Sequence, residues 1–346
     1  MHRIDKYFDW SFRALLIFLP FYTVLSVFFS QKLGIPGVSF IKEILMLWMI
    51  ACIVVADISW YKKIIWSRYD LFLFLYIAIA LVVTSFTTGL TGMVYGGRYD
   101  FSFLVAFFAL YHGRVFLREP VAYYLQLFLI SGGIMLLISI LLKWPFSEDL
   151  LRYVGYSGNP SHWQFWGPPT IFHGVDGANV RRFQGLLDGP NTMWAYLILY
   201  MGILAYYFRN YKAWYFVIGC VLLVLSIFLF YTYSRSAILW LIIWVGIIIL
   251  FLLPKIYKRY KAQLISTSLI VIAIIGGVFF QYAENIGTLV VRGGSTNGHM
   301  ERMQAGIERF LEKPFWHGLW SAGPAYRYVE NLAGKSREEI ESLDKK

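Results

Sequence analysis

Charged residues are scarce in this chain of 346 residues, at 15%, whereas hydrophobic residues make up 58% and aromatic residues 19%. A soluble protein of this length could not cover so much apolar surface, which excludes a soluble globular fold and requires side chains that face lipid. Cysteine is also rare. Cys52 and Cys220 both lie within apolar runs, which argues against a disulfide framework and a cysteine-based metal site.

Several sequence motifs of common enzymes are absent. There is no Walker motif, no Gly-x-Gly-x-x-Gly fingerprint, no Gly-x-Ser-x-Gly elbow and no His-Glu-x-x-His helix. His162 and His173 lack the spacing of metal ligands. We therefore expect neither a metal nor a cofactor, so that the energy for any reaction must come with the substrate.

Long apolar runs predict an all-α, polytopic bundle of transmembrane helices. A bilayer core needs roughly 20 apolar helical residues. The run from Ala14 to about Phe29 has no cleavage site after it, so we expect a retained helix, with a signal peptide as the alternative. The sequence predicts about nine spans: 13–30, 38–57, 70–88, 100–112, 121–142, 190–208, 213–231, 236–253 and 264–283.

The distribution of lysine and arginine predicts that the N-terminus is cytoplasmic. With this orientation the inner segments carry fourteen Lys and Arg residues, and the three short outer connections carry three. Positive charge gathers on the cytoplasmic side of membrane proteins, where it sets the orientation of the spans. The net charge of +11 therefore indicates topology and a basic outer surface rather than nucleic-acid binding.

Two outer segments are too long to be simple connections. The expected organisation is spans one to five over 1–142, an extracytoplasmic loop over 143–189, spans six to nine over 190–283, and an extracytoplasmic helical segment over 284–346. The first segment is rich in Trp, Phe and Ile, and we expect it to pack on the outer mouth of the bundle. No span closes the chain after the second segment, and we expect the chain to be truncated, with a nine-span form whose C-terminus lies outside as the alternative.

Five arginines are predicted to lie at one depth on the outer side: Arg98, Arg181, Arg182, Arg235 and Arg302. One such arginine alone is usually a surface charge or an interfacial anchor. A set of them is more informative, since guanidinium groups donate paired hydrogen bonds to phosphates and carboxylates. We expect them to meet around a diphosphate or a carboxylated sugar.

The stretch RRFQGLLDGPN holds further candidates. Pro190 is well placed as the first residue of the sixth span. Asp188 could cap that helix or, less readily, bind substrate. Asn191 could bond either to a sugar hydroxyl or to neighbouring backbone.

The sequence indicates a proton acceptor less clearly than it indicates the candidate arginines. His299 lies three residues before Arg302, on one face of a predicted helix, and a guanidinium beside an imidazole favours its neutral form. His299 is a candidate general base; packing on the loop is the alternative, and Glu301 is a competing base. Lys42 and Glu43 are expected to pair with each other.

Three segments resemble the O-antigen ligase and polymerase superfamily: RRFQGLLDGPN before a span, YTYSRSAILWLI at the start of a span, and ERMQAGIERFLEKPFWHGLWSAGPAY. The resemblance covers the chain from about Arg98 onward, and the first three spans match only in hydropathy. Family ligases usually carry a further outer-loop histidine near the last spans, and nothing in this chain matches it.

The resemblance implies an inverting membrane glycosyltransferase of the GT-C kind, in a bacterial inner membrane with its active site facing the periplasm. Such enzymes transfer a glycan from undecaprenyl diphosphate to an acceptor hydroxyl, without nucleotide or metal. Ligases use lipid A–core as the acceptor in lipopolysaccharide biosynthesis, and polymerases use another glycan repeat. Arg182, Arg235 and Arg302 would bind the diphosphate and stabilise the departing charge. Independently of the resemblance, the sequence offers Arg98, Arg181, Asp188 and Asn191 as further substrate-binding candidates.

Two other classes of function remain open from the residues. A transporter of lipid-linked sugars should carry ionisable groups or helix breaks near the bilayer midplane, and midspan charge is nearly absent here. A structural or sensor protein would not need convergent arginines.

Overall fold

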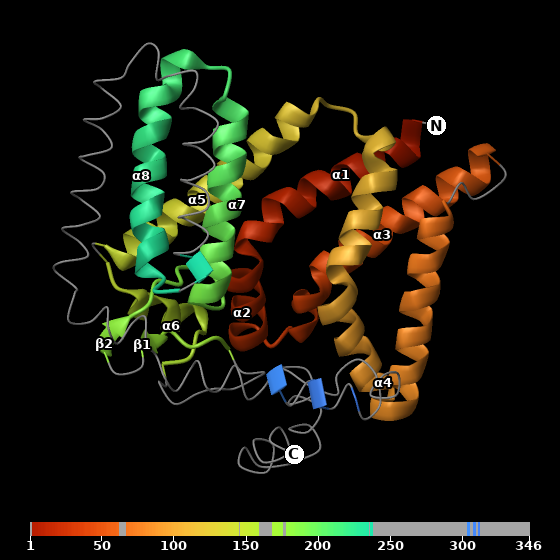
Figure 1. The fold of residues 1–346 in the computed structure, drawn as a ribbon, viewed down its shortest axis with the longest axis horizontal. Coiled ribbons are helices and arrows are strands. Elements are labelled where there is room, and N and C mark those ends of the chain that lie inside the picture. Colours follow the sequence, from red (N-terminus) through yellow and green to blue (C-terminus); the bar gives the residue numbers. More distant parts are fainter. Residues whose placement is uncertain are drawn as a thin grey trace. The chain divides into compact units, whose positions relative to one another are not determined.

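The computed structural model describes residues 2–61, 67–144, 146–158, 168–175, 178–234, 236–237, 303–304, 307–308 and 311. Within this part the chain is mostly helical (Figure 1). The described residues fall into two compact units, one within Met1–Ser131, Trp163–Pro168 and Asn297–Lys346 and the other within Gly132–His162 and Pro169–Thr296. These are called unit 1 and unit 2.

Unit 1 opens with a helix that is broken near its middle. Helix α1 (His2–Phe18) is followed by a 3-10 turn, η1 (Leu19–Phe21), and by α2 (Tyr22–Lys32). Pro20 lies inside the turn, where its missing N–H and its ring prevent an uninterrupted α-helix. The apolar stretch Ile4–Lys32 is long enough to span a membrane, and it contains the first predicted span.

Helix α3 (Ile41–Ala56) follows a second 3-10 turn, η2 (Pro36–Phe40), and packs against α1. The core between them is a cluster of buried residues: Phe8, Met49, Cys52, Ile53, Ala56, Ala109 and Phe116. A short π-helical turn, η3 (Asp57–Tyr61), ends the element. The burial of Cys52 agrees with its position in an apolar run.

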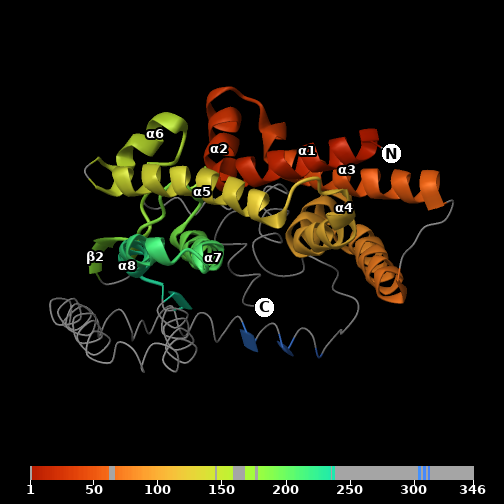
Figure 2. The same cartoon turned by 90° about the horizontal axis from the view of Figure 1, so that it is seen from above.

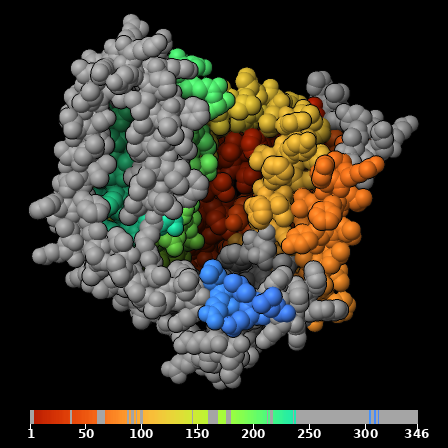
Figure 3. All heavy atoms as spheres, in the orientation of Figure 1, coloured from red at the N-terminus to blue at the C-terminus, as the bar shows by residue number. Residues whose placement is uncertain are grey.

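Helix α4 (Arg68–Gly113) is a helical hairpin rather than one rod (Figure 1). Its two arms pack antiparallel, with the rings of Phe74 and Phe108 4.8 Å apart and His112 Nε2 3.1 Å from Asp70 Oδ1. The sequence predicted spans 70–88 and 100–112 with a short outer connection, Gly89–Tyr99, between them. These bounds are wrong, because the chain reverses at Gly89 and the second arm resumes as a helix directly after it. The arms form part of the face seen in Figure 3.

The reversal depends on the backbone of Gly89. Its φ of 75° and ψ of −178° lie in a region that is essentially reserved for glycine. Ser67 begins the first arm with a capping box, in which Ser67 and Asp70 each accept a hydrogen bond from the other's backbone N–H. The short 3-10 turn η4 (Arg114–Phe116) follows the second arm.

Helix α5 (Val121–Lys143) starts in unit 1 and ends in unit 2. Unit 2 continues with η5 (Glu148–Leu150), α6 (Leu151–Val154), β1 (Gly174–Val175) and β2 (Ala178–Arg181), and then with α7 (Pro190–Phe208), η6 (Lys212–Trp214) and α8 (Tyr215–Tyr231). The strands pair antiparallel, with Gly174 opposite Arg181. Helices α7 and α8 lie side by side in both views (Figures 1 and 2).

Among the described residues, four stretches are long and apolar enough to cross a membrane: Ile4–Lys32, Val38–Ser59, Arg68–Phe86 and Val121–Lys143. Phe101–Phe116 and Val217–Tyr231 are shorter apolar helices. The prediction of a helical membrane protein is therefore confirmed in general, and the number of nine spans stays a prediction. The last two predicted spans, 236–253 and 264–283, lie almost wholly outside the described residues.

Gly89→Ala should destabilise the chain through its backbone alone, because open space surrounds the position where a Cβ would lie. A side chain in this conformation costs on the order of 1–3 kcal/mol. Thermal unfolding of the purified protein in detergent should show a lower melting temperature. Gly219→Ala is the matched control, since Gly219 lies inside α8 and also has open space at its Cβ. An equal melting temperature for parent and Gly89→Ala would contradict the proposed role of this glycine.

Candidate functional site

The loop before α7 is held against helix ends in unit 2. The Phe183 N–H donates to the carbonyl oxygen of Tyr231 at the end of α8, at 2.8 Å. The Leu186 N–H donates to Ser139 Oγ on α5 at 3.1 Å, and the Tyr156 hydroxyl donates to the Leu186 carbonyl oxygen at 2.6 Å. In unit 2 the loop therefore packs on the helices, where Phe183 is fully buried, and its position on the outer mouth of the bundle stays a prediction.

Gly185 permits this close approach. Its φ is 56°, in the left-handed region that favours glycine, and a Cβ at this position would collide with the side chains of Ser139 and Met193. The RRFQG motif thus needs its glycine for two reasons, backbone conformation and space against α5 and α7.

Arg182 joins the two helix ends of unit 2. Its Nε donates to the carbonyl oxygen of Thr232, just beyond α8, at 2.8 Å, and its Nη2 donates to Oδ1 of Asn191, in the first turn of α7, at 3.0 Å. The last carbonyl groups of a helix have no partner within the helix and carry partial negative charge. The Arg182 guanidinium gives the Thr232 carbonyl a hydrogen-bond donor and places positive charge beside this helix end. Its bonds to Thr232 and Asn191 fix Arg182 between the ends of α7 and α8.

The turn after α8 is strained. Tyr233 has a φ of 48°, and a bulky residue rarely adopts this left-handed conformation. Its side chain is 6% exposed, and its ring lies 5.9 Å from that of Phe230. Strain of this kind persists only where the surroundings fix the backbone, and it gathers at functional sites. Here it occurs two residues before Arg235 in the sequence.

The start of α7 differs in part from the prediction. Pro190 is the first helical residue, as predicted. The cap is Gly189, with an extended backbone and no side-chain hydrogen bond, so the capping role considered for Asp188 is wrong. A capping side chain must belong to the Ncap residue itself to reach the N–H groups two or three positions later, and Asp188 stands one residue too early. Asp188 is exposed.

His173 lies at this helix start, and sequence reasoning missed it. The imidazole hydrogen-bonds with the backbone of Asp188, and Nε2 is shielded from water without a hydrogen-bond partner among the described residues. A Cβ on Gly189 would lie 3.6 Å from that nitrogen. Burial lowers the pKa of His173, as does the nearby charge of Arg182, while Asp188 opposes the change. The ring is therefore neutral near pH 7.

Gln184 is the other unsatisfied polar group in the motif. It is fully buried, and neither Oε1 nor Nε2 has a hydrogen-bond partner among the described residues. An unpaired buried amide costs free energy, and such groups in folded proteins usually meet water or a ligand. No motif predicted a special role for this residue.

Arg181 belongs to a neighbouring cluster on the loop. Its Nη1 lies 3.4 Å from Asp149 Oδ1, and its guanidinium lies over the Phe172 ring at 4.1 Å. Arg152 lies over the same ring at 5.1 Å and 3.5 Å from the same carboxylate oxygen. The Ser147 hydroxyl is the largest cause that lowers the pKa of Asp149, and both arginines add to it.

Arg98 lies in unit 1, where Glu43, Ser39 and Tyr22 accept hydrogen bonds from its side chain. Its Nε donates to Glu43 Oε1 at 2.7 Å, and its Nη2 donates to the Ser39 carbonyl oxygen at 2.7 Å and to the Tyr22 hydroxyl. Lys42 Nζ lies 3.7 Å from Glu43 Oε1, so the predicted pairing of Lys42 and Glu43 is confirmed, although Arg98 is the closer partner.

The predicted site residues are thus placed as follows. Arg182 and Asn191 are in contact in unit 2, and Arg181 and Asp188 belong to the same unit. Arg98 belongs to unit 1. Arg235, Arg302 and His299 lie outside the described residues, and so does the competing base Glu301. The predicted meeting of all the arginines stays a prediction.

Comparison with known proteins bears on the segment that begins within α8. Residues 218–340 match a family model described as O-antigen ligase. The match supports membership of the O-antigen ligase superfamily. It contains two of the three segments on which the resemblance was based, and together with the apolar helices it supports a membrane protein similar to O-antigen ligases and polymerases. No curated protein and no solved structure gives a match.

The family match has general implications for function. It suggests an enzyme of the glycosyltransferase or ligase type, with a lipid-linked glycan and an acceptor as partners. The third segment, RRFQGLLDGPN, lies before residue 218, but Arg182 and Phe183 hydrogen-bond to Thr232 and Tyr231 inside the matched range. The loop motif therefore contacts the family segment directly.

The lowered pKa of His173 predicts a pH dependence of stability. The unfolded imidazole takes up a proton near its ordinary pKa of 6.5, whereas the buried ring does so only at lower pH. The free energy of unfolding should therefore fall as pH decreases from about 6.5 toward the folded-state pKa of His173, and then change no further on its account. Thermal unfolding at closely spaced pH values from 7.5 to 5 measures this dependence.

His173→Gln should weaken the pH dependence in this window while keeping a polar side chain at the start of α7. Parent and variant share all other titratable groups, so the difference between their two curves isolates His173. Parallel curves for the two proteins would contradict the assignment of a buried, neutral imidazole.

Proposed function

We propose that the protein is a membrane glycosyltransferase of the O-antigen ligase type. It transfers a glycan from undecaprenyl diphosphate to an acceptor hydroxyl, that of lipid A–core, on the extracytoplasmic side of a bacterial inner membrane. The same family match fits a polymerase, which extends a lipid-linked glycan, and the choice between the two depends on the acceptor. Transport of lipid-linked sugars without a reaction is the remaining alternative.

One observation carries the proposal: Arg182 contacts the turn that leads to Arg235. The Arg182 Nε donates to the Thr232 carbonyl oxygen, and Thr232 precedes Arg235 by three residues inside the segment of the O-antigen ligase family. The contact joins residues fifty positions apart and holds Arg182 beside the turn that precedes Arg235 in the sequence. Such a contact favours a shared site over two separate surface charges.

In the proposed reaction the acceptor hydroxyl oxygen bonds to the anomeric carbon of the glycan. The bond between that carbon and the diphosphate oxygen breaks, and the electron pair leaves with undecaprenyl diphosphate. The hydroxyl proton passes to a base, for which His299 is proposed and Glu301 is the competitor. Arg182, Arg235 and Arg302 stabilise the negative charge that develops on the diphosphate, a contribution that is often the largest in catalysis.

The surroundings of Arg182 support this role. Its guanidinium is positioned by Thr232 and Asn191 before any substrate arrives, so little reorganisation is needed when charge develops. The neighbouring start of α7 adds backbone N–H groups and the positive end of a helix dipole, both of which favour phosphate oxygens. Arg98, Arg181, Asp188 and Asn191 are proposed to contact the glycan or the diphosphate.

Substitution of Arg182, Arg235 or Arg302 by Ala should abolish most product formation. Loss of one fixed donor to a developing negative charge typically lowers the rate by roughly a hundredfold or more. The assay supplies purified lipid-linked glycan and either lipid A–core or a second lipid-linked repeat, and it measures the glycan product by mass. The acceptor that reacts distinguishes ligase from polymerase.

Arg209→Ala is the matched control, because Arg209 follows the far end of α7 and lies over the Tyr206 ring at 3.8 Å. Each variant is tested for retained thermal stability. Turnover near that of the parent in all three arginine variants would overturn the enzymatic proposal. A transport assay on the same proteins would then test movement of the intact lipid-linked sugar.

A further inference from the structure

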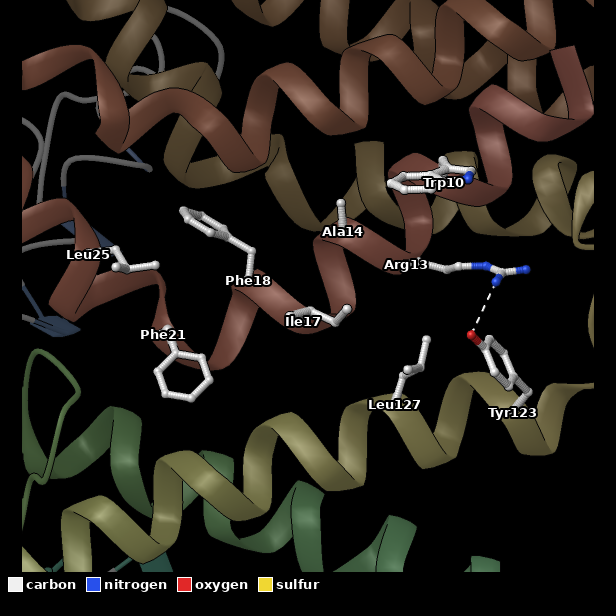
Figure 4. Close-up of a pocket in the computed structure, with 9 residues that line it drawn as sticks. All are labelled: Trp10, Arg13, Ala14, Ile17, Phe18, Phe21, Leu25, Tyr123 and Leu127. Carbon is white, nitrogen blue, oxygen red and sulfur yellow. Dashed lines mark hydrogen bonds between the residues drawn. The ribbon is translucent and has the colours of Figure 1, made fainter. Parts of the chain in front are cut away.

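A lateral groove of about 590 Å³ lies in unit 1, far in sequence from the arginines of the proposed reaction (Figure 4). One wall consists of α1, η1 and the start of α2, and the other of α5. Its volume lies in the range of sites that hold small ligands. Nine residues line it: Trp10, Arg13, Ala14, Ile17, Phe18, Phe21, Leu25, Tyr123 and Leu127.

The groove exists because the first helix bends. Pro20 interrupts the α-helix at Leu19–Phe21, so that residues on both sides of the turn line the same cavity. Ala14 contributes only a methyl group to the wall. The result is a groove whose lining is overwhelmingly carbon, in a segment that is long and apolar enough to span a membrane.

The polar groups of the groove gather at one end. Figure 4 shows Arg13 directed toward Tyr123, with Trp10 close by, and Phe18, Phe21 and Leu25 toward the other end. The Arg13 Nη1 donates to the Tyr123 hydroxyl at 3.1 Å. Such a division between a polar end and an apolar length matches an amphiphile that has a headgroup and a hydrocarbon chain.

The charges at the polar end are unequal. Arg13 Nη2 lies 2.6 Å from Asp9 Oδ2 and 3.5 Å from Glu119 Oε1. Asp9 is 2% exposed and also accepts a hydrogen bond from the Tyr124 hydroxyl, so it acts as an internal partner. The side chain of Glu119 is 45% exposed. One guanidinium thus faces two carboxylates, which leaves Glu119 to attract a cation.

Arg13 retains capacity to donate. Its Nη1 carries a second N–H besides the one directed at the Tyr123 hydroxyl, and the side chain is 25% exposed. A phosphate oxygen is well suited to accept from a guanidinium N–H, because the hydrogen bond is charge-assisted. The groove end therefore offers a donor for an anion and, beside it, a carboxylate for a cation.

We propose that this groove binds a glycerophospholipid whose headgroup carries a phosphate and a primary ammonium group. One acyl chain lies along Ile17, Phe18 and Leu25, the phosphate accepts from Arg13, and the ammonium pairs with Glu119. Trp10 lies at the headgroup level, where the indole ring of tryptophan is commonly found. The site belongs to unit 1 and does not depend on the proposed transferase reaction.

Charge complementarity selects this lipid over related ones. A purely anionic headgroup would satisfy Arg13 but would place negative charge beside Glu119, and like charges at this distance repel. A quaternary ammonium headgroup carries the positive charge but has no N–H to donate to the carboxylate. Only a primary ammonium offers both the charge and the hydrogen bonds.

Native mass spectrometry of the full chain tests the proposal. The purified protein is exposed to an equimolar mixture of phosphatidylethanolamine, phosphatidylglycerol and phosphatidylcholine with identical acyl chains. The ethanolamine lipid should be bound roughly fivefold over each of the others, which corresponds to about 1 kcal/mol, the upper value for an exposed ion pair. It should also raise the melting temperature of the protein more than the others do.

Two variants test the binding of the headgroup and the binding of the acyl chain separately. Glu119→Gln keeps the shape of the side chain and should bring the three lipids to equal binding. Ala14→Trp fills the groove from a position that is exposed, and should lower the binding of all three lipids. Arg114→Ala is the matched control, because Arg114 lies outside the groove over the Tyr111 ring at 5.0 Å, and it should leave the preference unchanged.

Three results would overturn the proposal. These are equal or anionic preference in the parent protein, an ethanolamine preference that persists in Glu119→Gln, and displacement of the bound lipid by an equimolar polyprenyl phosphate. The last outcome would make the groove a site for the isoprenoid chain of a donor. Because the readout is lipid binding, failure here leaves the transferase proposal intact, and loss of transferase activity leaves this one intact.

Discussion

The hydrogen bond from Arg182 to the carbonyl oxygen of Thr232 positions the proposed site in unit 2. It connects a loop residue to the end of α8, while a second bond from the same guanidinium reaches Asn191 at the start of α7. The planar guanidinium of Arg182 has several donors in fixed positions, so it can bond to Thr232 and to Asn191 at the same time. A lysine at this position has a single point charge and could not hold both partners in the same geometry.

Buried polar groups follow a consistent rule in unit 1. Asp9 on α1 pairs with Arg13 on the same helix and accepts a hydrogen bond from Tyr124 on α5, and Glu43 on α3 pairs with Arg98 on α4. An unpaired charge in such surroundings would be costly. These pairs fix which helices are neighbours, because the apolar faces themselves carry little directional information.

Much of the architecture could be predicted from composition. Apolar runs located the helices, and Pro190 correctly marked the start of α7. The reversal in α4 could not be predicted, since glycines are frequent between 89 and 97 and the sequence does not show that Gly89 alone takes the required conformation. Asp188 was misread for a related reason: the choice between two adjacent cap positions depends on backbone angles.

The site was only partly accessible to sequence reasoning. Motif spacing identified Arg182 and Asn191, which the fold brings into contact. His173 and Gln184 carry no motif of their own, and their significance comes from burial and from polar atoms without partners. Similarly, the pairing of Arg98 with Glu43 joins residues fifty-five positions apart, and no local pattern could indicate it.

The bend at Pro20 has a consequence for how the first segment meets the bilayer. The stretch Ile4–Lys32 contains 29 residues, and as a straight helix it would extend roughly 43 Å, against about 30 Å of hydrocarbon. Such a mismatch would force a steep tilt or a local thickening of the membrane. Dividing the segment into two shorter rods shortens its end-to-end length, so the chain accommodates its excess apolar residues without deforming the lipid around it.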